Sequence, residues 1–476
     1  MKYYVTTAIP YVNANLHVGN AMDYVMADVL ARYARQQDKT VIFSTGTDEH
    51  GAKIAEKAAE AGQEVQVFVD EMSVRVKDLF KLMNISYDRF VRTTDKDHEK
   101  RAQAIWKALA EDIYKSKYVG WYCTGDEEFF TETVVKENGG ICPDHNRPYE
   151  RVEEENYFFR LSKYNDQIKK AIESNHFKVV PDIRRNEILS LLSEGLEDIS
   201  ISRPKDKVSW GIAVPGDDTQ VIYVWFEALL NYLTVIGYPD EPAFREYWPA
   251  DVQVIGKGIL RFHAGIWPGI LLALELPLPE TLFVHGYCTI NGQKISKTLG
   301  NVILPADIIK THGADAFRYY LLRHVPSYED GDFNWAAFEK AYNSELANEL
   351  GNALQRTVAM ILNYQEGNIG ELSLRDVDVS AYTDALNSFR FDKALDFVWE
   401  RVRALNQYID EQKPWAIAKT GDSKRLSEVL GYQASTLLQI ADLLNPFLPE
   451  TSAKIQSVLS GAKVNPLGST LFPKSS

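Results

Sequence analysis

The N-terminal residues alternate between strand-like and helix-like segments, and this alternation limits the folds open to the chain. Residues 3–7 are an aromatic and β-branched run, and residues 16–35 carry apolar side chains at helical spacing. Residues 40–44 form a second apolar run, and residues 52–61 have a helical pattern again. Strand, helix, strand, helix at this rhythm predicts a parallel sheet with right-handed crossovers.

The pattern changes near Tyr118. From there to residues 157–159, aromatic and β-branched residues alternate with glycines and acidic residues, which predicts a mostly β insertion with helices near its end. The α/β pattern then resumes, with a helix beginning near Glu227. The strands expected in this second half are residues 220–225, 251–255 and 282–285.

After about Trp335 the pattern is helical, with one amphipathic helix expected from Leu386 to Ile409 and another containing Leu437–Leu444. The fold class is therefore α/β, a Rossmann-like parallel-sheet domain split by the insertion and followed by an all-α bundle. The expected divisions are residues 1–116 and 216–334 for the halves of the sheet domain, 117–215 for the insertion and 335–476 for the bundle.

The charge balance excludes some classes of protein. The 476 residues include 52 Lys and Arg against 66 Asp and Glu, a formal net charge of -14, which argues against a general nucleic-acid coat or a polybasic membrane binder. From residue 331 onward there are 14 basic against 18 acidic residues, so any RNA recognition there requires a few placed side chains. Three scattered cysteines and the polar character of residues 3–22 predict a reduced, cytoplasmic location without a signal segment or membrane span.

Residues 10–20 lie between the first strand and its helix. A helix N-terminus at the carboxyl end of a parallel strand binds anions, so His17 can donate to polyphosphate and Gly19 allows close approach to the backbone. By itself, a His-x-Gly sequence is usually only a turn.

Residues 292–301 follow the strand that ends near His285. Lys294 and Lys297 flank Ser296 between two glycines, a pattern typical of a mobile cationic loop that closes on a triphosphate. A solvated surface turn has the same composition.

Taken together, the two motifs indicate a function more specifically than either does alone. His17–Asn20 resembles the HIGH signature of class I aminoacyl-tRNA synthetases, and Lys294–Thr298 resembles their KMSKS signature. The flanking residues narrow the resemblance to the methionyl-tRNA synthetase family, and it extends over nearly the whole chain. These flanking blocks are Ala8–Tyr11, Gly46–Gly51, Tyr223–Ala228 and Arg261–His263.

The resemblance implies activation of methionine by ATP with Mg²⁺, followed by transfer to tRNA(Met) for translation initiation and elongation. His17, Asn20, Lys294 and Lys297 are then the expected catalytic residues, and Gly19 and Ser296 complete the ATP site. Asn20 stands where the signature usually closes with His; an amide still donates a hydrogen bond, so reduced rather than lost function is expected.

The resemblance also implies a methionine site, in which Asp48 pairs with the substrate ammonium and aromatic rings surround the thioether. A helix N-cap is the ordinary alternative for Asp48, and core packing is the alternative for the apolar residues. The expected methionine-binding residues are Ile9, Tyr11, Asp48, Trp225, Ala228, Leu229, Tyr232 and His263.

In the helical third the resemblance implies reading of the CAU anticodon by Asn352, Arg356 and Trp415. From sequence alone, a helix-packing anchor is the better interpretation of Trp415, and the resemblance reverses this preference. The chain ends shortly after this bundle, without the extra C-terminal tRNA-binding domain through which some relatives dimerise. We therefore expect a monomer.

The insertion of some relatives carries a zinc knuckle. Here Cys123, Asp126, Cys142 and His145 have a comparable spacing and could bind structural zinc, although the carboxylate replaces a soft ligand and some relatives lack the metal.

Other classes remain as alternatives. Leucyl, isoleucyl and valyl enzymes need an editing insertion for which the chain has no room, and the Trp225 pocket does not fit a cysteinyl-tRNA synthetase. A nucleotidyltransferase with the HIGH signature would lack the bundle. A non-catalytic tRNA-binding relative is disfavoured because both signatures retain their His, Gly and Lys.

Overall fold

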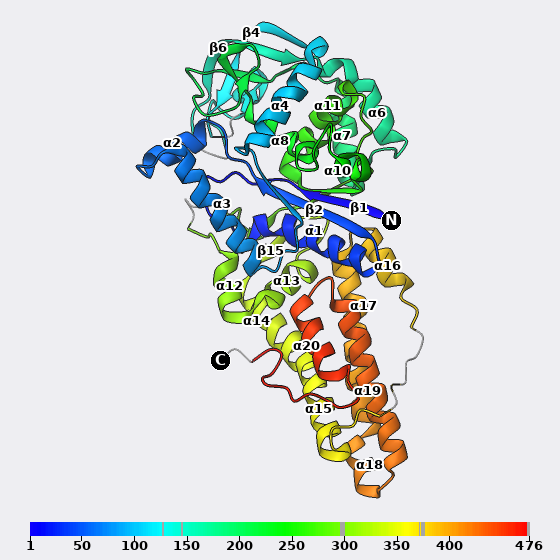
Figure 1. Ribbon diagram of the computed structural model, residues 1–476. Coiled ribbons are helices and arrows are strands. Elements are labelled where there is room, and N and C mark those ends of the chain that lie inside the picture. Colours follow the sequence, from blue (N-terminus) through cyan, green and yellow to red (C-terminus); the bar gives the residue numbers. More distant parts are fainter. Residues whose placement is uncertain (126–127, 144–145, 296–299, 371, 373–376, 474–476) are drawn as a thin grey trace. The chain divides into compact units, whose positions relative to one another are not determined.

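The structure is a computed structural model that describes residues 1–476 except 126–127, 144–145, 296–299, 371, 373–376 and 474–476 (Figure 1). The chain folds into two compact units. Unit 1 consists of residues 1–15, 38–78 and 87–284, and unit 2 of residues 16–37, 79–86 and 285–476.

Unit 1 is built on a six-stranded sheet with the order β3-β2-β1-β12-β13-β7. Val5 of the central strand β1 lies opposite Phe43 on one side and Val252 on the other, and both pairings are parallel. The parallel sheet predicted from the N-terminal rhythm is confirmed. The strands are β1 (Lys2–Thr7), β2 (Thr40–Thr47), β3 (Arg89–Arg92), β7 (Lys178–Val180), β12 (Val252–Gly256) and β13 (Thr281–His285).

Helices of unit 1 pack on this sheet through a continuous apolar core. Tyr4 of β1 and Ile42 of β2 share this core with Trp106, Tyr232 and Trp267 from the helices. The helices are α2 (Ala52–Glu60), α4 (Lys96–Ala108), α6 (Asn165–Glu173), α7 (Asp182–Glu194), α8 (Val224–Leu229), α9 (Asn231–Thr234), α10 (Pro242–Tyr247), the π-helix η4 (Phe262–Ile266) and α11 (Trp267–Ala273). Helix α3 (Val65–Leu82) begins in unit 1 and ends in unit 2.

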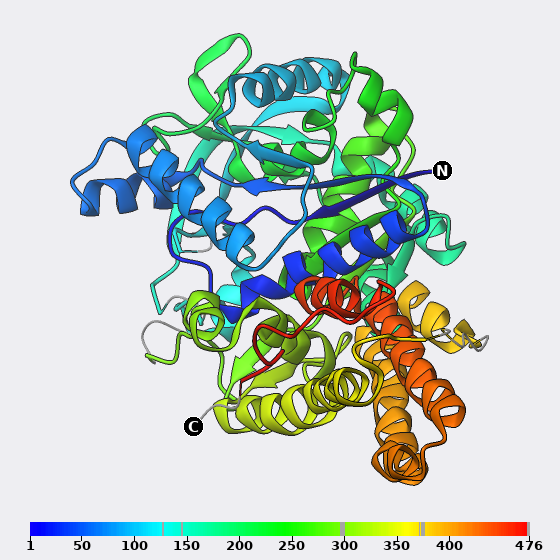
Figure 2. The same ribbon diagram turned by 60° about the horizontal axis from the view of Figure 1, so that its bottom comes forward.

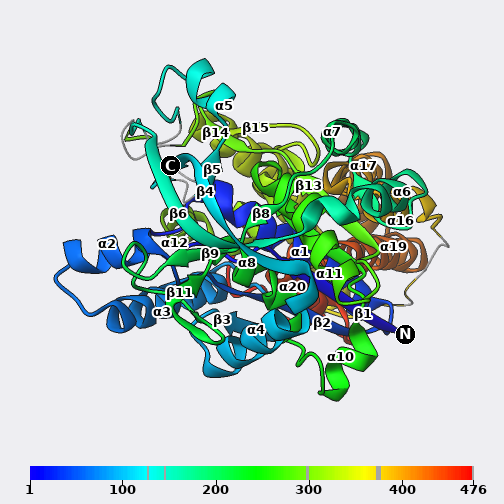
Figure 3. The same ribbon diagram turned by 90° about the horizontal axis from the view of Figure 1, so that it is seen from above.

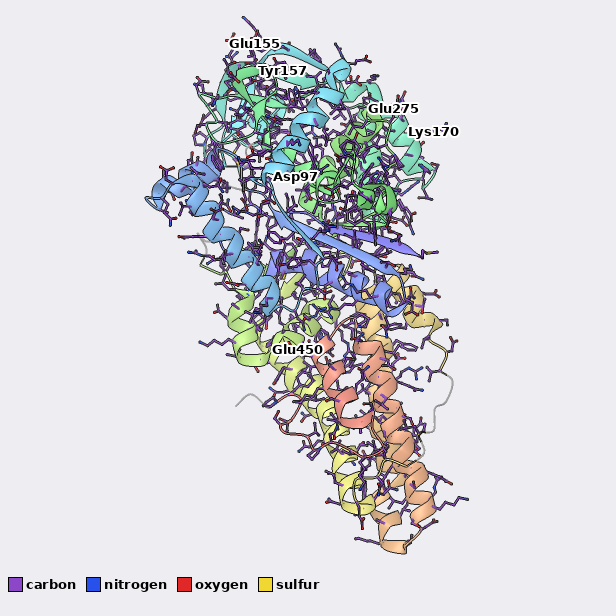
Figure 4. All side chains as sticks on the ribbon, in the orientation of Figure 1. Asp97, Glu155, Tyr157, Lys170, Glu275 and Glu450 are labelled. Atoms are coloured by element: carbon purple, nitrogen blue, oxygen red, sulfur yellow. The ribbon has the colours of Figure 1, made fainter. Side chains whose placement is uncertain are left out.

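The insertion contains a four-stranded antiparallel sheet with the order β5-β4-β6-β8. Strands β4 and β6 form a long pair (Figure 3), along which Lys115 contacts Glu155 and Tyr157, both labelled in Figure 4. Residues 178–180 also fall within the predicted insertion, but they pair with β13 of the main sheet. The insertion elements are β4 (Ile113–Cys123), β5 (Glu128–Phe130), α5 (Glu132–Glu137), β6 (Glu150–Phe159) and β8 (Ile199–Ser200).

The strand expected at residues 220–225 was placed wrongly. Strand β11 (Asp217–Ile222) belongs to a separate antiparallel sheet between β10 (Ala213–Val214) and β9 (Ser202–Pro204), and helix α8 begins at Val224. An apolar β-branched run fits either sheet, so its pattern alone does not identify the partner strand.

Unit 2 contains the helical bundle predicted for the C-terminal third. Helices α15, α17 and α19 run beside one another, and α20 packs on α19 (Figures 1 and 2). Within the described residues no strand follows β15. The elements are α1 (Val18–Gln36), β14 (Cys288–Ile290), α12 (Pro305–His312), α13 (Ala314–Arg323), β15 (Gly331–Phe333), α14 (Trp335–Ala341), the π-helix η5 (Tyr342–Gly351), α15 (Asn352–Gln365), α16 (Ser380–Asn387), α17 (Phe391–Gln412), α18 (Pro414–Thr420), α19 (Ser423–Leu444) and α20 (Pro449–Leu459).

The single helix expected from Leu386 to Ile409 is two helices. Phe389 adopts a positive φ of 57° between α16 and α17, and the Arg390 amide donates to the Ala385 carbonyl. Leu386 and Phe389 are buried before the break and Leu395 and Val398 after it, so hydrophobic periodicity does not reveal it.

A buried ion pair fastens α1 within unit 2. Arg318 is fully buried, lies 2.7 Å from the Asp28 carboxylate and donates to the carbonyls of Pro446 and Phe447. Because a buried charge is tolerated only when its hydrogen bonds are made, these contacts hold α1 against the loop that precedes α20. No helix in the described ranges is both long and apolar enough to cross a membrane.

Candidate active site

The turn that resembles the HIGH signature is the N-terminal cap of α1. His17 Nδ1 accepts a hydrogen bond from the Gly19 amide, and the His17 amide donates to Asn20 Oδ1, both at 3.1 Å. This arrangement is a reciprocal capping box. Because Nδ1 is an acceptor, the neutral imidazole carries its proton on Nε2 and presents a donor beside the positive end of the helix dipole.

Gly19 lies in a closely packed position. A Cβ atom there would lie 3.1 Å from the His17 ring and 3.2 Å from Ile295 Cδ1. The Val18 amide also donates to the Ile303 carbonyl at 3.1 Å. The two sequence motifs therefore lie against each other within unit 2.

The cationic loop begins with a tight turn after β14. Gly292 has a φ of 74°, and its amide donates to the carboxylate of Asp332 on β15. Lys294 is exposed, and its carbonyl accepts a hydrogen bond from the Asn301 side chain. Two of the predicted site residues, Ser296 and Lys297, lie outside the described residues.

Asp48 follows β2 in unit 1 and is 3% exposed. Its amide donates to the Pro10 carbonyl and its carbonyl accepts from the Val12 amide, which forms a parallel bridge between Tyr11 and Asp48. No helix begins at Asp48; the N-cap of α2 is Gly51. The alternative of a helix cap is therefore excluded for Asp48.

Aromatic rings gather beside this segment. Tyr11 meets Trp225 edge-on, with ring centroids 6.1 Å apart, and Trp225 stacks on Phe262 at 4.5 Å. Ala228 and Leu229 are buried on α8, the helix that also carries Trp225. Ile9, just after the end of β1, is half-buried.

Two hydrogen bonds orient His263, the histidine of the predicted methionine pocket. His263 Nδ1 lies 3.0 Å from the Ile259 carbonyl, and His263 Nε2 lies 2.7 Å from the Tyr232 hydroxyl. Since a carbonyl only accepts, Nδ1 carries the proton and Nε2 accepts from the tyrosine. The two contacts therefore hold the imidazole in a fixed orientation.

Sequence reasoning missed several residues that contact these side chains. Phe262 was not assigned to the pocket, although it lies between the quoted Arg261 and His263. Glu227 of α8 forms a buried cluster with His50 and His98. His50 and Glu227 lie inside the quoted blocks Gly46–Gly51 and Tyr223–Ala228, whereas His98 lies outside all of them.

The three predicted anticodon residues lie near one another at the end of the bundle. Asn352 and Arg356 are one turn apart on α15, and the Arg356 guanidinium lies 5.7 Å from the centre of the Trp415 ring. Arg356 also donates to Asp410 of α17 at 2.7 Å. Trp415 is 36% exposed, so it is not a buried packing anchor.

The predicted zinc ligands are described only in part. Cys123 and Cys142 are buried in one small cluster with Val135 and Tyr149, whereas Asp126 and His145 lie outside the described residues. Among the residues that the structure describes, no group of three or more His, Cys, Asp or Glu could hold a metal ion.

Comparison with known proteins places this geometry in a family. The family model for class I tRNA synthetases (M) matches residues 3–151 and 145–358. The methionine–tRNA ligase of Thermotoga maritima is 43% identical over 96% of this chain and 75% of its own length. That of Caldanaerobacter subterraneus is 45% identical over 95% of this chain and 73% of its own.

Solved structures give the same result. The Mycobacterium tuberculosis methionyl-tRNA synthetase in complex with methionyl-adenylate superposes with a TM-score of 0.92 and 35% identity, covering 99% of each chain. The chain therefore belongs to the methionyl-tRNA synthetases, a family of the class I aminoacyl-tRNA synthetases.

Proposed function

We propose that this chain is a methionine–tRNA ligase, which activates L-methionine with ATP and transfers the methionyl group to tRNA(Met). The observation that carries this conclusion is the match over nearly the full chain to a structure solved with methionyl-adenylate. Methionine carboxylate attacks the α-phosphate of ATP and pyrophosphate leaves. A hydroxyl of the terminal adenosine of tRNA then attacks the adenylate carbonyl, and AMP leaves.

In this function, the residues of unit 2 bind ATP. The Nε2 donor of His17 and the amide of Asn20 contact the phosphates at the N-terminus of α1, and Lys294 and Lys297 neutralise the charge of the departing pyrophosphate. Gly19 and Ser296 complete this set. Mg²⁺ supplies further charge neutralisation on the phosphates when bound.

The residues of unit 1 bind methionine. Asp48 pairs with the ammonium group, and Trp225, Tyr11 and Phe262 surround the thioether, where sulfur–aromatic contacts add to apolar burial. The fixed Tyr232–His263 pair closes one side of the pocket beside Ile9, Ala228 and Leu229.

Amino-acid-dependent ATP–pyrophosphate exchange across a panel of amino acids, followed by charging of tRNA, tests the function. We expect exchange with methionine above all others. Trp225→Ala and Asp48→Asn should each raise the methionine KM sharply and leave the ATP KM unchanged. Exchange driven equally by cysteine, or a methionine KM that neither substitution changes, would contradict the proposed site.

We further propose anticodon reading of CAU by Asn352, Arg356 and Trp415, and the division of the chain into residues 1–116, 117–215, 216–334 and 335–476. A monomeric state and a cytoplasmic location complete the proposal. Light scattering of the purified chain measures the first, and cell fractionation measures the second.

Zinc, if bound, would be held by Cys123 and Cys142 together with Asp126 and His145 and would be structural. The burial of both thiols in one cluster supports this donor set. Metal analysis of protein purified without chelator, with Cys142→Ser as the comparison, tests it.

A further inference from the structure

Glu227 lies inside unit 1 with its side chain almost fully buried. Its Oε1 lies 2.8 Å from His50 Nδ1, and its Oε2 lies 2.9 Å from His98 Nε2. Both imidazoles are also buried. Burial alone raises the pKa of a carboxyl group, but the two histidines outweigh it and hold the pKa of Glu227 below its ordinary value. Glu227 is therefore an ionised acceptor shared by two imidazoles.

The three residues come from separate segments. His50 follows β2, two residues after Asp48. Glu227 lies on α8, two residues after Trp225. His98 lies in the first turn of α4, and its other ring nitrogen is 2.8 Å from the Thr234 hydroxyl on α9. The carboxylate thus joins the segment that carries Asp48 to the helix that carries Trp225, with α4 as a third support.

The opposite side of the Asp48 segment is already anchored. The two oxygens of the Glu49 carboxylate share a bifurcated hydrogen bond from Arg92 Nε, at 2.8 and 3.0 Å, and Oε2 also accepts from Nη2 at 2.8 Å. The Trp210 indole donates to the Glu49 carbonyl, and the Trp210 carbonyl accepts from the Gly51 amide. Residues 49–51 are therefore fixed to β3 and to the loop that carries Trp210, and His50 is the member of this segment that reaches α8.

We propose that Glu227 is a positioning residue for methionine: through His50 and His98 it sets the separation between the ammonium partner Asp48 and the side-chain pocket at Trp225. This inference rests on the proposed methionine site. Every amino acid has the ammonium group, whereas the aromatic pocket recognises the side chain. Selectivity for methionine therefore requires both contacts at one separation, and Glu227 maintains it.

The decisive variant is Glu227→Gln, which preserves shape but offers one acceptor atom to two imidazole donors. We expect the methionine KM to rise roughly tenfold or more, because a charge-assisted buried hydrogen bond is lost. The ATP KM should stay within about twofold, and kcat at saturating methionine should fall much less than kcat/KM. The ratio of kcat/KM for methionine over homocysteine should fall in parallel.

Paired histidine variants separate positioning from folding. In His50→Asn the amide nitrogen replaces Nδ1, and in His98→Gln it replaces Nε2, so both should retain a methionine KM near that of the parent chain. His50→Leu and His98→Leu should raise it. A double-mutant cycle of His50→Leu with Glu227→Gln should be strongly non-additive.

Asp112→Asn is the matched control, because Asp112 is another buried carboxylate of unit 1 and accepts from Tyr164 and Lys163, neither of which is assigned to the methionine site. It should lower the unfolding temperature and leave the methionine KM unchanged. The inference is overturned if Glu227→Gln and His50→Leu leave the methionine KM within about twofold while Asp48→Asn raises it. If Asp48→Asn and Trp225→Ala also have no effect, the proposed methionine site itself is wrong.

Discussion

Lys294 is an exposed lysine whose position is set by its backbone. The turn at Gly292 is held by Asp332, and the Lys294 carbonyl accepts from Asn301, so the base of the loop is ordered on both sides. Lys294 itself is exposed.

Lys294→Ala should therefore affect chemistry rather than methionine binding. We expect the rate of adenylate formation to fall roughly 100-fold, the effect typical of losing one stabilising donor. Pre-steady-state rates, with methionine affinity measured in the same preparation, test this. Lys310→Ala, at an exposed lysine of α12, is the control and should leave both quantities unchanged.

Asn20 stands where the HIGH signature usually closes with His, and its hydrogen bonds show which atoms of the amide can still contact a ligand. Its side-chain oxygen accepts from the His17 amide and completes the capping box, which leaves its NH₂ group as the donor available to a ligand. The sequence indicated that a donor was retained. The capping contact was visible only in the fold.

Among the secondary-structure elements, helix α20 is capped by a residue from a different helix. The Thr451 amide, in the first turn of α20, donates to Asp315 Oδ2 of α13 at 2.6 Å. Glu450, labelled in Figure 4, is the neighbouring residue in that turn. Burial raises the pKa of Asp315 to about 6, despite the hydrogen bonds from Thr451 that favour its charged form.

This raised pKa predicts a pH-dependent stability. The folded state holds the proton more tightly than the unfolded chain, so the contribution of Asp315 is fully present below its ordinary pKa and is lost as the pH rises through about 6. Asp315→Asn keeps the acceptor without the charge. Its free energy of unfolding relative to the parent chain should therefore rise between about pH 4 and pH 8, by at most about 3 kcal/mol.

Urea unfolding at several pH values measures this difference. Asp315→Ala is the comparison, since it removes the cap as well and should lose about 1 kcal/mol of cap stabilisation at every pH. Curves for Asp315→Asn and the parent chain that run parallel across this range would show that the carboxyl titrates alike in both states.

For the molecule as a whole, net charge limits how tRNA can be bound. The chain is acidic overall, and so is the part from residue 331 onward. Arg356, a proposed anticodon contact, is paired with Asp410 in the free protein. RNA must therefore compete with this carboxylate, and binding should be weak and sensitive to salt.

Substitutions at the proposed anticodon site should affect the charging of tRNA but not the activation of methionine. Arg356→Ala should lower kcat/KM for tRNA(Met) by about tenfold or more and leave ATP–pyrophosphate exchange intact. Asp410→Asn should lower the KM for tRNA, because it frees the arginine. Exchange of the CAU anticodon should abolish charging by the parent chain. Equal losses in exchange and charging would instead indicate a folding defect.

Local pattern determined much of this protein. The alternation of strands and helices led to the parallel sheet, and the motifs at His17 and Lys294 led to the family. These features depend on residues close in sequence, whose spacing reflects helix and strand geometry directly.

Only the tertiary structure decided which distant segments meet. In the fold, β11 belongs to a separate sheet, the helix expected from Leu386 to Ile409 is interrupted at Phe389, and Glu227 contacts His50 and His98. Strand partners and buried hydrogen bonds are selected by packing among segments far apart in the chain, and a lone glutamate in a helical pattern does not reveal which histidines it will meet.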